Sequence, residues 1–369
     1  MISKNEVYKF EPPYLIPPGE TLLETIEEMD LSQAELARRT GRPLKTINGI
    51  IKGDIAITPD TALQFERVLG IPAKFWINLE TNYREAIARA KHMEALEKDT
   101  AWLKNFPIRE LIKKGWIERK DNEKEQLDEL LKFFGVASIK AWGDIWQQGV
   151  VAFRKSPTLE SNQYALACWI RKAEIEAVKQ DCAEYDKRKF KQSLIQLRML
   201  TKETEPCKFI PKMERICNEC GVAVVFIPEL NGTRVSGATK WLNSKNPMIA
   251  LSVRYKTNDH LWFTFFHEAG HIILHGKKDT FIEGFEIEDQ KEKEKEAEAD
   301  RFASNLLIPP NEYEKFVQEK TFSADKIKMF ADRIGIAPGI VVGRLQHDKY
   351  IPFSWHNKLK VYYKWEDED

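Results

Sequence analysis

The stretch Thr264–Gly276, TFFHEAGHIILHG, places two histidines four residues apart, with a glutamate directly after the first. Residues four apart lie one turn apart on the same face of an α-helix. His267 and His271 can therefore each direct one ring nitrogen at a single metal ion, while Glu268 stands beside a water bound there. The stretch predicts a metal-holding helix, in which Gly270 permits close packing of another backbone.

Two further histidines flank this pair. His275 lies eight residues from His267, which is about 12 Å along a helix axis, so the three cannot bind one ion. We expect His275 to be a C-terminal turn residue that interacts with the helix dipole. His260, two turns upstream, is expected to be structural.

A catalytic zinc needs a third protein ligand and an open position for water. The next strong helical pattern, EKEKEAEADRFASNLLIPP, joins a run of carboxylates to an apolar stripe that begins at Ala299. Burying this stripe against the histidine helix would bring its acidic edge to the metal. Most of the run is a solvated face, and Glu296 and Glu298 are the two candidates for the third ligand.

The segment that contains these patterns has mixed secondary structure. From Cys207 the sequence predicts a helix, FIPKMERICNECG, then three strands in VAVVFIPE, SGATKWL and PMIALSVR. We expect an antiparallel sheet that leads into the histidine helix. Cys217 and Cys220 form a lone C-x-x-C, more consistent with packing at a helix end than with a metal site.

The N-terminal segment predicts a string of short helices. Ser32 caps a helix with Glu35 as its capping box, Gly41 forces a turn, and the next helix runs from Pro43 to Gly53. Two short helices joined by a glycine turn are typical of a helix-turn-helix, whose second helix enters the major groove of DNA. A plain helical bundle has the same periodicity.

Composition argues against a strongly basic nucleic-acid binder. The chain has 57 Lys and Arg against 57 Asp and Glu, and between Ile16 and Glu85 the counts are eight against eleven. The basic patch that neutralises phosphate is therefore not obvious. Five scattered cysteines fit a reducing compartment. With no signal-like or membrane-length apolar run, we expect a cytoplasmic protein without a membrane partner.

The run from Ile16 to Tyr83 resembles the HigA-type antitoxins of the XRE repressor family, in LSQAELA, ITPDTAL and LGIPAKFWINL. This resemblance implies operator DNA as a partner, a homodimer formed through this segment, and a toxin partner. It places the DNA contacts on Arg42, Lys45, Thr46, Asn48 and Lys52.

HEAGHIILHG followed by EAEADRFASNLLIP resembles the ImmA/IrrE family of zinc peptidases. The resemblance implies Zn²⁺ as cofactor, His267 and His271 as ligands, Glu268 as general base and Glu298 as third ligand, with Glu296 as the alternative. It also implies a repressor or antitoxin as protein substrate. Tyr255, Tyr313 and His275 remain options for assisting an oxyanion.

We therefore predict an α+β multidomain protein in four segments. These are an all-α helix-turn-helix domain (1–85), a tryptophan-rich helical middle region (86–206), an α+β zincin-like metallopeptidase domain (207–310) and a C-terminal helical extension (311–369). In the extension, Ser323 caps two short helices split at Gly335 to Gly339, ahead of a strand-like tail.

The predicted function is a zinc-dependent endopeptidase coupled to a regulator domain. One alternative is a DNA-binding antitoxin or transcription regulator whose metallopeptidase domain serves as a sensor or toxin-binding module without significant proteolysis. A pure scaffold, which would bind no metal, is the third.

Overall fold

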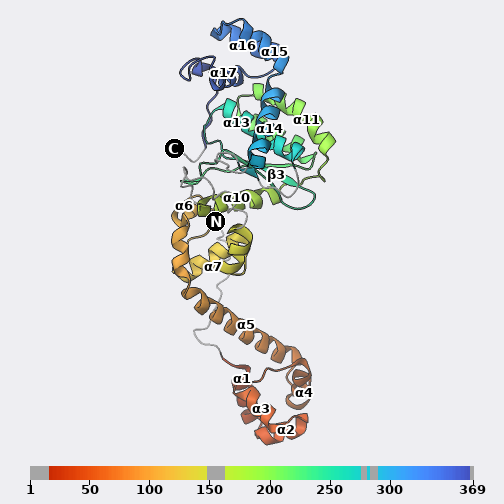
Figure 1. Ribbon diagram of the computed structural model, residues 1–369. Coiled ribbons are helices and arrows are strands. Elements are labelled where there is room, and N and C mark those ends of the chain that lie inside the picture. Colours follow the sequence, from red (N-terminus) through yellow and green to blue (C-terminus); the bar gives the residue numbers. More distant parts are fainter. Residues whose placement is uncertain (1–15, 148–162, 276–280, 283–289, 366–369) are drawn as a thin grey trace, which may run out of the picture. The chain divides into compact units, whose positions relative to one another are not determined.

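The computed structural model describes residues 16–147, 163–275, 281–282 and 290–365 (Figure 1). The chain divides into two compact units: the first ends at Ala101 and also takes in Asn122–Asp128, and the second contains the rest. The five cysteines are free thiols. Among the described helices, none combines the length and the apolar character needed to cross a membrane.

Five helices make up most of the first unit. They are α1 (Pro18–Glu28), α2 (Gln33–Thr40), α3 (Leu44–Ile51), α4 (Pro59–Leu69) and α5 (Ala73–Glu97). Their apolar faces enclose one core, in which Phe65 and Trp76 are fully buried.

The α2–α3 turn forms as the sequence predicts. Ser32 Oγ accepts a hydrogen bond from the backbone N–H of Glu35 at 3.1 Å, and Gly41 ends α2 in the left-handed conformation, with φ of 68°. A Cβ added at Gly19 would lie 2.2 Å from the carbonyl oxygen of Ile50. The absence of a side chain at Gly19 therefore lets α1 approach the backbone of α3.

The second unit joins many helices to one small sheet. Its helices are α6 (Ile108–Lys113), α7 (Glu123–Phe134, which starts in the first unit), α8 (Ile139–Trp142), α10 (Gln163–Val178), α11 (Lys187–Met199), α12 (Pro206–Asn218), α13 (Asn258–Leu274), α14 (Gln290–Leu307), α15 (Pro310–Gln318), α16 (Ala324–Ile334) and α17 (Pro338–His347). Short helical turns are η1 (Thr100–Asn105, shared between the units), η2 (Gly143–Gln147), η3 (Leu200–Lys202) and η4 (Asn357–Leu359).

The sheet contains β1 (Ala223–Phe226), β2 (Gly237–Trp241), β3 (Pro247–Leu251) and β4 (Phe281–Ile282) in the order β1-β3-β2-β4. β2 pairs antiparallel with β3 and β4, but β1 pairs parallel with β3. The expectation of a purely antiparallel sheet is therefore wrong. β2 and β3 form a hairpin, and β1 adds to the far edge of β3 instead of pairing with the strand that follows it.

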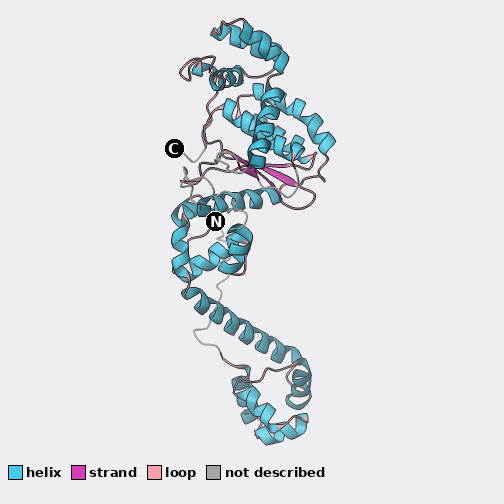
Figure 2. Ribbon diagram, in the orientation of Figure 1, coloured by secondary structure: helices cyan, strands magenta, loops and turns pink. Residues whose placement is uncertain are grey.

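Successive side chains of the strands face two different cores. Val224 and Ile249 contribute to a core with α13, whereas Ala223 and Ala250 contribute to a second core with α10. Figure 2 shows helices on both sides of the sheet. Because α10 buries its apolar face on this sheet, part of the predicted middle region is structurally one body with the predicted metallopeptidase segment.

The predicted C-terminal extension belongs to the same body. Its helices α15, α16 and α17 bury residues in the core that contains α13. Ser323 caps α16 and Gly335 ends it with φ of 77°, as predicted. The predicted four segments therefore assemble into two units.

Candidate metal centre

α13 carries the histidine pair through the middle of the second unit. The helix begins after Thr257. The segment after α17 (348–365, the C-terminal tail) fixes its first turn, because the backbone N–H of Val361 donates to Asn258 Oδ1 at 3.1 Å. Nearly every residue from Leu261 to Ile273 is buried. A helix that is buried on all sides is apolar all round, which accounts for the apolar sequence of α13.

α14 lies against α13 at a glycine. A Cβ added at Gly270 would lie 3.3 Å from Ala299 Cα and 3.2 Å from the ring of Phe302. This confirms the prediction that Gly270 allows another backbone to pack closely. The contact brings the acidic half of α14 beside the two histidines.

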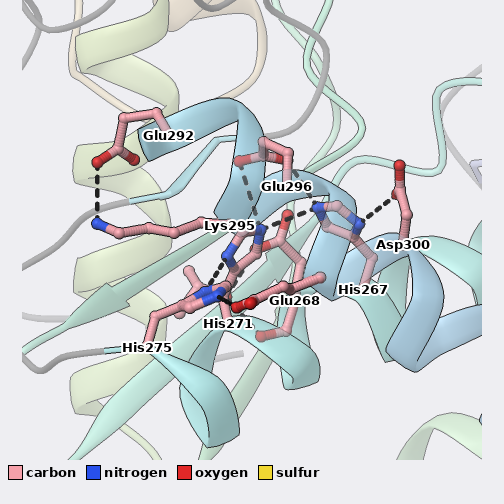
Figure 3. A network of polar contacts seen from close by, with 10 residues as sticks. His267, Glu268, His271, His275, Glu292, Lys295, Glu296 and Asp300 are labelled. Carbon is pink, nitrogen blue, oxygen red and sulfur yellow. Dashed lines mark hydrogen bonds and ion pairs between the residues drawn. The ribbon is translucent and has the colours of Figure 1, made fainter. Parts of the chain in front are cut away.

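Three side chains converge at this contact (Figure 3). The Nε2 atoms of His267 and His271 lie 2.9 Å apart, and the carboxylate of Glu296 lies 3.1 Å from the first and 3.5 Å from the second. One ligand atom from each lies within 4.8 Å of those of the others. Two imidazoles and a carboxylate are a donor set that zinc takes in catalytic sites.

Glu298, the third ligand that the resemblance implied, lies elsewhere. Its carboxylate is half exposed and contacts His275 Nε2 at 3.2 Å. Residues two apart on a helix point about 200° away from each other, so Glu296 and Glu298 cannot face one ion together. The structure brings Glu296, the alternative, to the histidines instead.

Two further side chains hold the histidine rings from behind. Asp300 Oδ1 lies 2.9 Å from His267 Nδ1, and His275 Nδ1 lies 2.9 Å from His271 Nδ1. A carboxylate on Nδ1 fixes the tautomer that leaves the Nε2 lone pair free for a cation. The prediction missed Asp300, although its position one turn after Glu296 on the same helix was a usable signal.

The electrostatics suit a cation between these groups. Burial alone would raise the pKa of Glu296, but the hydrogen bonds with His267 and His271 outweigh it and lower this pKa to about 2. Burial lowers the pKa of His271, which favours the neutral imidazole that binds metals. The residues present therefore fit a divalent metal ion.

Glu268 sits beside the pair, between α13 and the sheet. Its side chain is fully buried, and the hydroxyl of Thr239 on β2 donates to Glu268 Oε2 at 2.6 Å. At the start of β2, a Cβ on Gly237 would lie 2.9 Å from Glu268 Oε1. The sheet thus fixes the carboxylate that the sequence predicted as the base, and Thr239 is a contact that no sequence motif indicated.

The three candidates for assisting an oxyanion have different surroundings. His275 contacts His271, as described. The hydroxyl of Tyr313 donates to Asp348 at 2.9 Å, and burial, with that carboxylate, raises the pKa of Tyr313. Tyr255 is exposed and stacks on His260, with ring centres 4.3 Å apart.

The predicted DNA contacts lie on α3 and beside it, in the first unit. Lys45 and Lys52 are exposed, and Thr46 and Asn48 are half-buried. Arg42 is tied to α4 because its Nε donates to Gln64 Oε1 at 2.7 Å. Three of these five residues lie on α3 itself, whereas the metal group, His267, His271 and Glu296, needs two helices.

Comparison with known proteins supports both parts. Residues 217–345 match the IrrE N-terminal-like domain of the Peptidase_M78 family, and residues 22–76 match the helix-turn-helix family. The chain belongs to the helix-turn-helix family and carries an IrrE N-terminal-like domain. The match over residues 217–345 supports an enzyme of the metallopeptidase type.

The relatives of known sequence or structure are similar over a short stretch. An uncharacterised HTH-type transcriptional regulator, YddM, of Escherichia coli is 30% identical over 71 residues, which are 19% of this chain and 76% of that protein. A HigA-family antidote protein from Coxiella burnetii is 34% identical, covering 23% of this chain and 92% of that one, with a TM-score of 0.22. Pseudomonas aeruginosa antitoxin HigA, solved with the higBA promoter, is 35% identical, covering 23% and 94%, with a TM-score of 0.22.

Proposed function

We propose that this protein is a zinc-dependent endopeptidase whose metal is held by His267, His271 and Glu296. The observation that carries the proposal is the convergence of two buried imidazole Nε2 atoms and one half-buried, ionised carboxylate on a common point. Two facing Nε2 atoms at 2.9 Å are stabilised by a cation between them. The match to the peptidase family supports the same assignment.

A zinc ion bound there would polarise the scissile carbonyl and favour ionisation of a water. The chain's own residues do the rest. Glu268 accepts the proton of the attacking water on its carboxylate and returns it to the leaving amine. Thr239 holds Glu268 Oε2, and Asp300 keeps Nδ1 of His267 protonated. The proposed role of third ligand thus passes from Glu298 to Glu296.

The helix-turn-helix domain supplies the context of the reaction in this proposal. A chain that joins this domain to a peptidase is suited to narrow proteolysis of a repressor or another regulatory protein in a stress or toxin–antitoxin setting. We propose operator DNA as a partner of the α2–α3 motif. The acidic balance of this unit favours weak binding that depends on a homodimer.

Elemental analysis of the purified protein, together with a cleavage assay on candidate repressors, tests the proposal. We expect about one zinc per chain, and we expect Glu268→Gln to retain zinc and lose cleavage. Asn305→Gln, an exposed change on α14, is the control and should retain both. Cleavage that survives Glu268→Gln would remove Glu268 from the role of base, and wild-type protein without metal would contradict the proposal.

One observation favours a second function, a DNA-binding regulator that senses a signal or a toxin through the peptidase fold without significant proteolysis. Glu268 is fully buried and already engaged by Thr239. Binding to the protein's own promoter across a salt series separates the two functions. A regulator shows sequence-selective promoter binding with a steep salt slope. This binding is retained in Glu268→Gln, and the wild-type protein cleaves no substrate.

A further inference from the structure

A pocket of about 380 Å³ lies between α13, α14, α17 and the C-terminal tail. Its walls are mostly apolar, with Phe263 from α13, Leu307 and Ile308 at the end of α14, Ile340 from α17 and Phe353 from the tail. This volume falls in the range of pockets that enclose a ligand the size of one or two amino-acid side chains and their backbone.

The pocket adjoins the metal group along the groove between α13 and α14. Phe263 lies one turn before His267, and the centres of their rings are 6.2 Å apart. Ser304, which also lines the pocket, lies one turn after Asp300, the partner of His267. A chain bound at the metal group therefore reaches the pocket with its neighbouring residue.

The pocket is formed before any occupant arrives. Asp259 and Lys360 make a buried ion pair at 2.6 Å, and a Cβ on Gly343 would lie 2.4 Å from Asp259 Oδ2. On α17, the buried amide of Gln346 donates to the carbonyl oxygens of Phe353 and Trp355, at 3.1 and 2.9 Å. These contacts join the tail to α17 and fix the wall that it provides.

Two observations indicate that the occupant is a peptide. Phe353 and Trp355 are 73% and 54% exposed, and exposed aromatic side chains beside a pocket are typical of protein-binding surfaces. The pocket also adjoins the histidines of the proposed metal site, because Phe263, one of its walls, lies one turn of α13 before His267.

We propose that this pocket binds a large apolar side chain of the protein substrate, such as leucine or phenylalanine, next to the bond that is cut. The identity of the occupant rests on the proposed peptidase function. Gln346 is a positioning residue in this scheme, because it acts through the tail.

A pocket-filling variant, Ser304→Phe, tests the proposal against Asn305→Phe, which adds the same ring at the adjacent, exposed position of α14. The probe is a pool of internally quenched peptides with the zinc-loaded protein. Wild type and Asn305→Phe should prefer large apolar residues at one position beside the cut. Ser304→Phe should reduce cleavage of those peptides at least tenfold while zinc content and cleavage of alanine-containing peptides persist. An unchanged profile in Ser304→Phe would overturn the proposal.

Binding separates this inference from the peptidase function. The same pool is passed over zinc-loaded Glu268→Gln with and without Ser304→Phe, and retained peptides are identified by mass spectrometry. If Glu268→Gln retains apolar peptides and the added Ser304→Phe change abolishes this retention, the pocket is supported. This conclusion holds even when wild type cleaves nothing, because a lack of cleavage would contradict only the proposed function. Equal retention overturns the pocket. If the protein binds oleate in a way that Ser304→Phe abolishes, but binds no apolar peptides, the proposal that the occupant is a peptide is overturned.

Phe353→Ala provides a second variant in which folding is not at risk, because this side chain is mostly exposed. It should raise KM for apolar peptides and leave zinc content unchanged. Met329→Ala, at a similarly exposed position of α16, is its control and should leave KM unchanged. A KM equal to that of wild type in Phe353→Ala would exclude the tail as a wall of the binding site.

Discussion

The helix-turn-helix of the first unit and the candidate metal centre of the second differ in how their residues come together. The candidate DNA contacts follow one another along α3 and its flanks, and most are reachable from solvent. The metal group takes two buried histidines from α13 and a carboxylate from α14, and is completed by α13–α14 packing at Gly270. The surface site needs only α3 and its flanks to be in place, whereas the buried site depends on the core that holds α13 and α14 together.

The largest expected effect distinguishes the two glutamates of α14. Glu296→Ala should weaken zinc binding more than about 100-fold, because loss of an outer partner alone costs about 10–100-fold and Glu296 would be a direct ligand. Glu298→Ala, two residues along, is the control and should stay close to wild type. Competition with a chelator of known affinity measures both. The reverse order would restore Glu298 as the ligand.

Asp300→Asn should have the next largest effect. An amide on His267 Nδ1 loses the charge that fixes the ring, so zinc affinity should fall about 10–100-fold. Glu294→Gln, an exposed change on the same helix, is the matched control. Equal zinc affinity in Asp300→Asn and wild type would show that the ring of His267 is fixed by packing alone.

Gly19→Ala tests whether the two units are independent. The added Cβ meets the carbonyl oxygen of Ile50, so α1 and α3 should separate at a cost of about 1–3 kcal/mol. Faster hydrogen exchange in both helices, with zinc content unchanged, is the expected result, and Glu20→Ala is the exposed control. A loss of zinc in Gly19→Ala would mean that the metal centre depends on the first unit.

The smallest effect concerns charge on α3. Lys45→Ala should weaken operator binding similarly for all sequences and reduce the salt slope by about one, as expected for one lost phosphate contact. Lys98→Ala, at the far end of the 25-residue helix α5, should leave the slope unchanged. A slope that is the same in Lys45→Ala and wild type would move the DNA surface away from α3.

Local patterns in the sequence were sufficient for several features. The Ser32 cap, the Gly41 turn and the histidine helix all form as predicted, because each depends on residues within a few positions. The pairing of β1 was mispredicted because a parallel neighbour depends on how a crossover packs, which periodicity does not show.

By itself the sequence determined which helix carries the imidazoles and that an acidic helix must meet it, since spacing along a helix sets which side chains share a face. Only the tertiary structure brought Glu296, and not Glu298, to the histidines, added the contacts of Asp300 and Thr239, and placed α17 and the tail beside them. The physical reason is that the rotation of α14 about its own axis is set by burial of its apolar stripe against α13, and this rotation depends on contacts far apart in the chain.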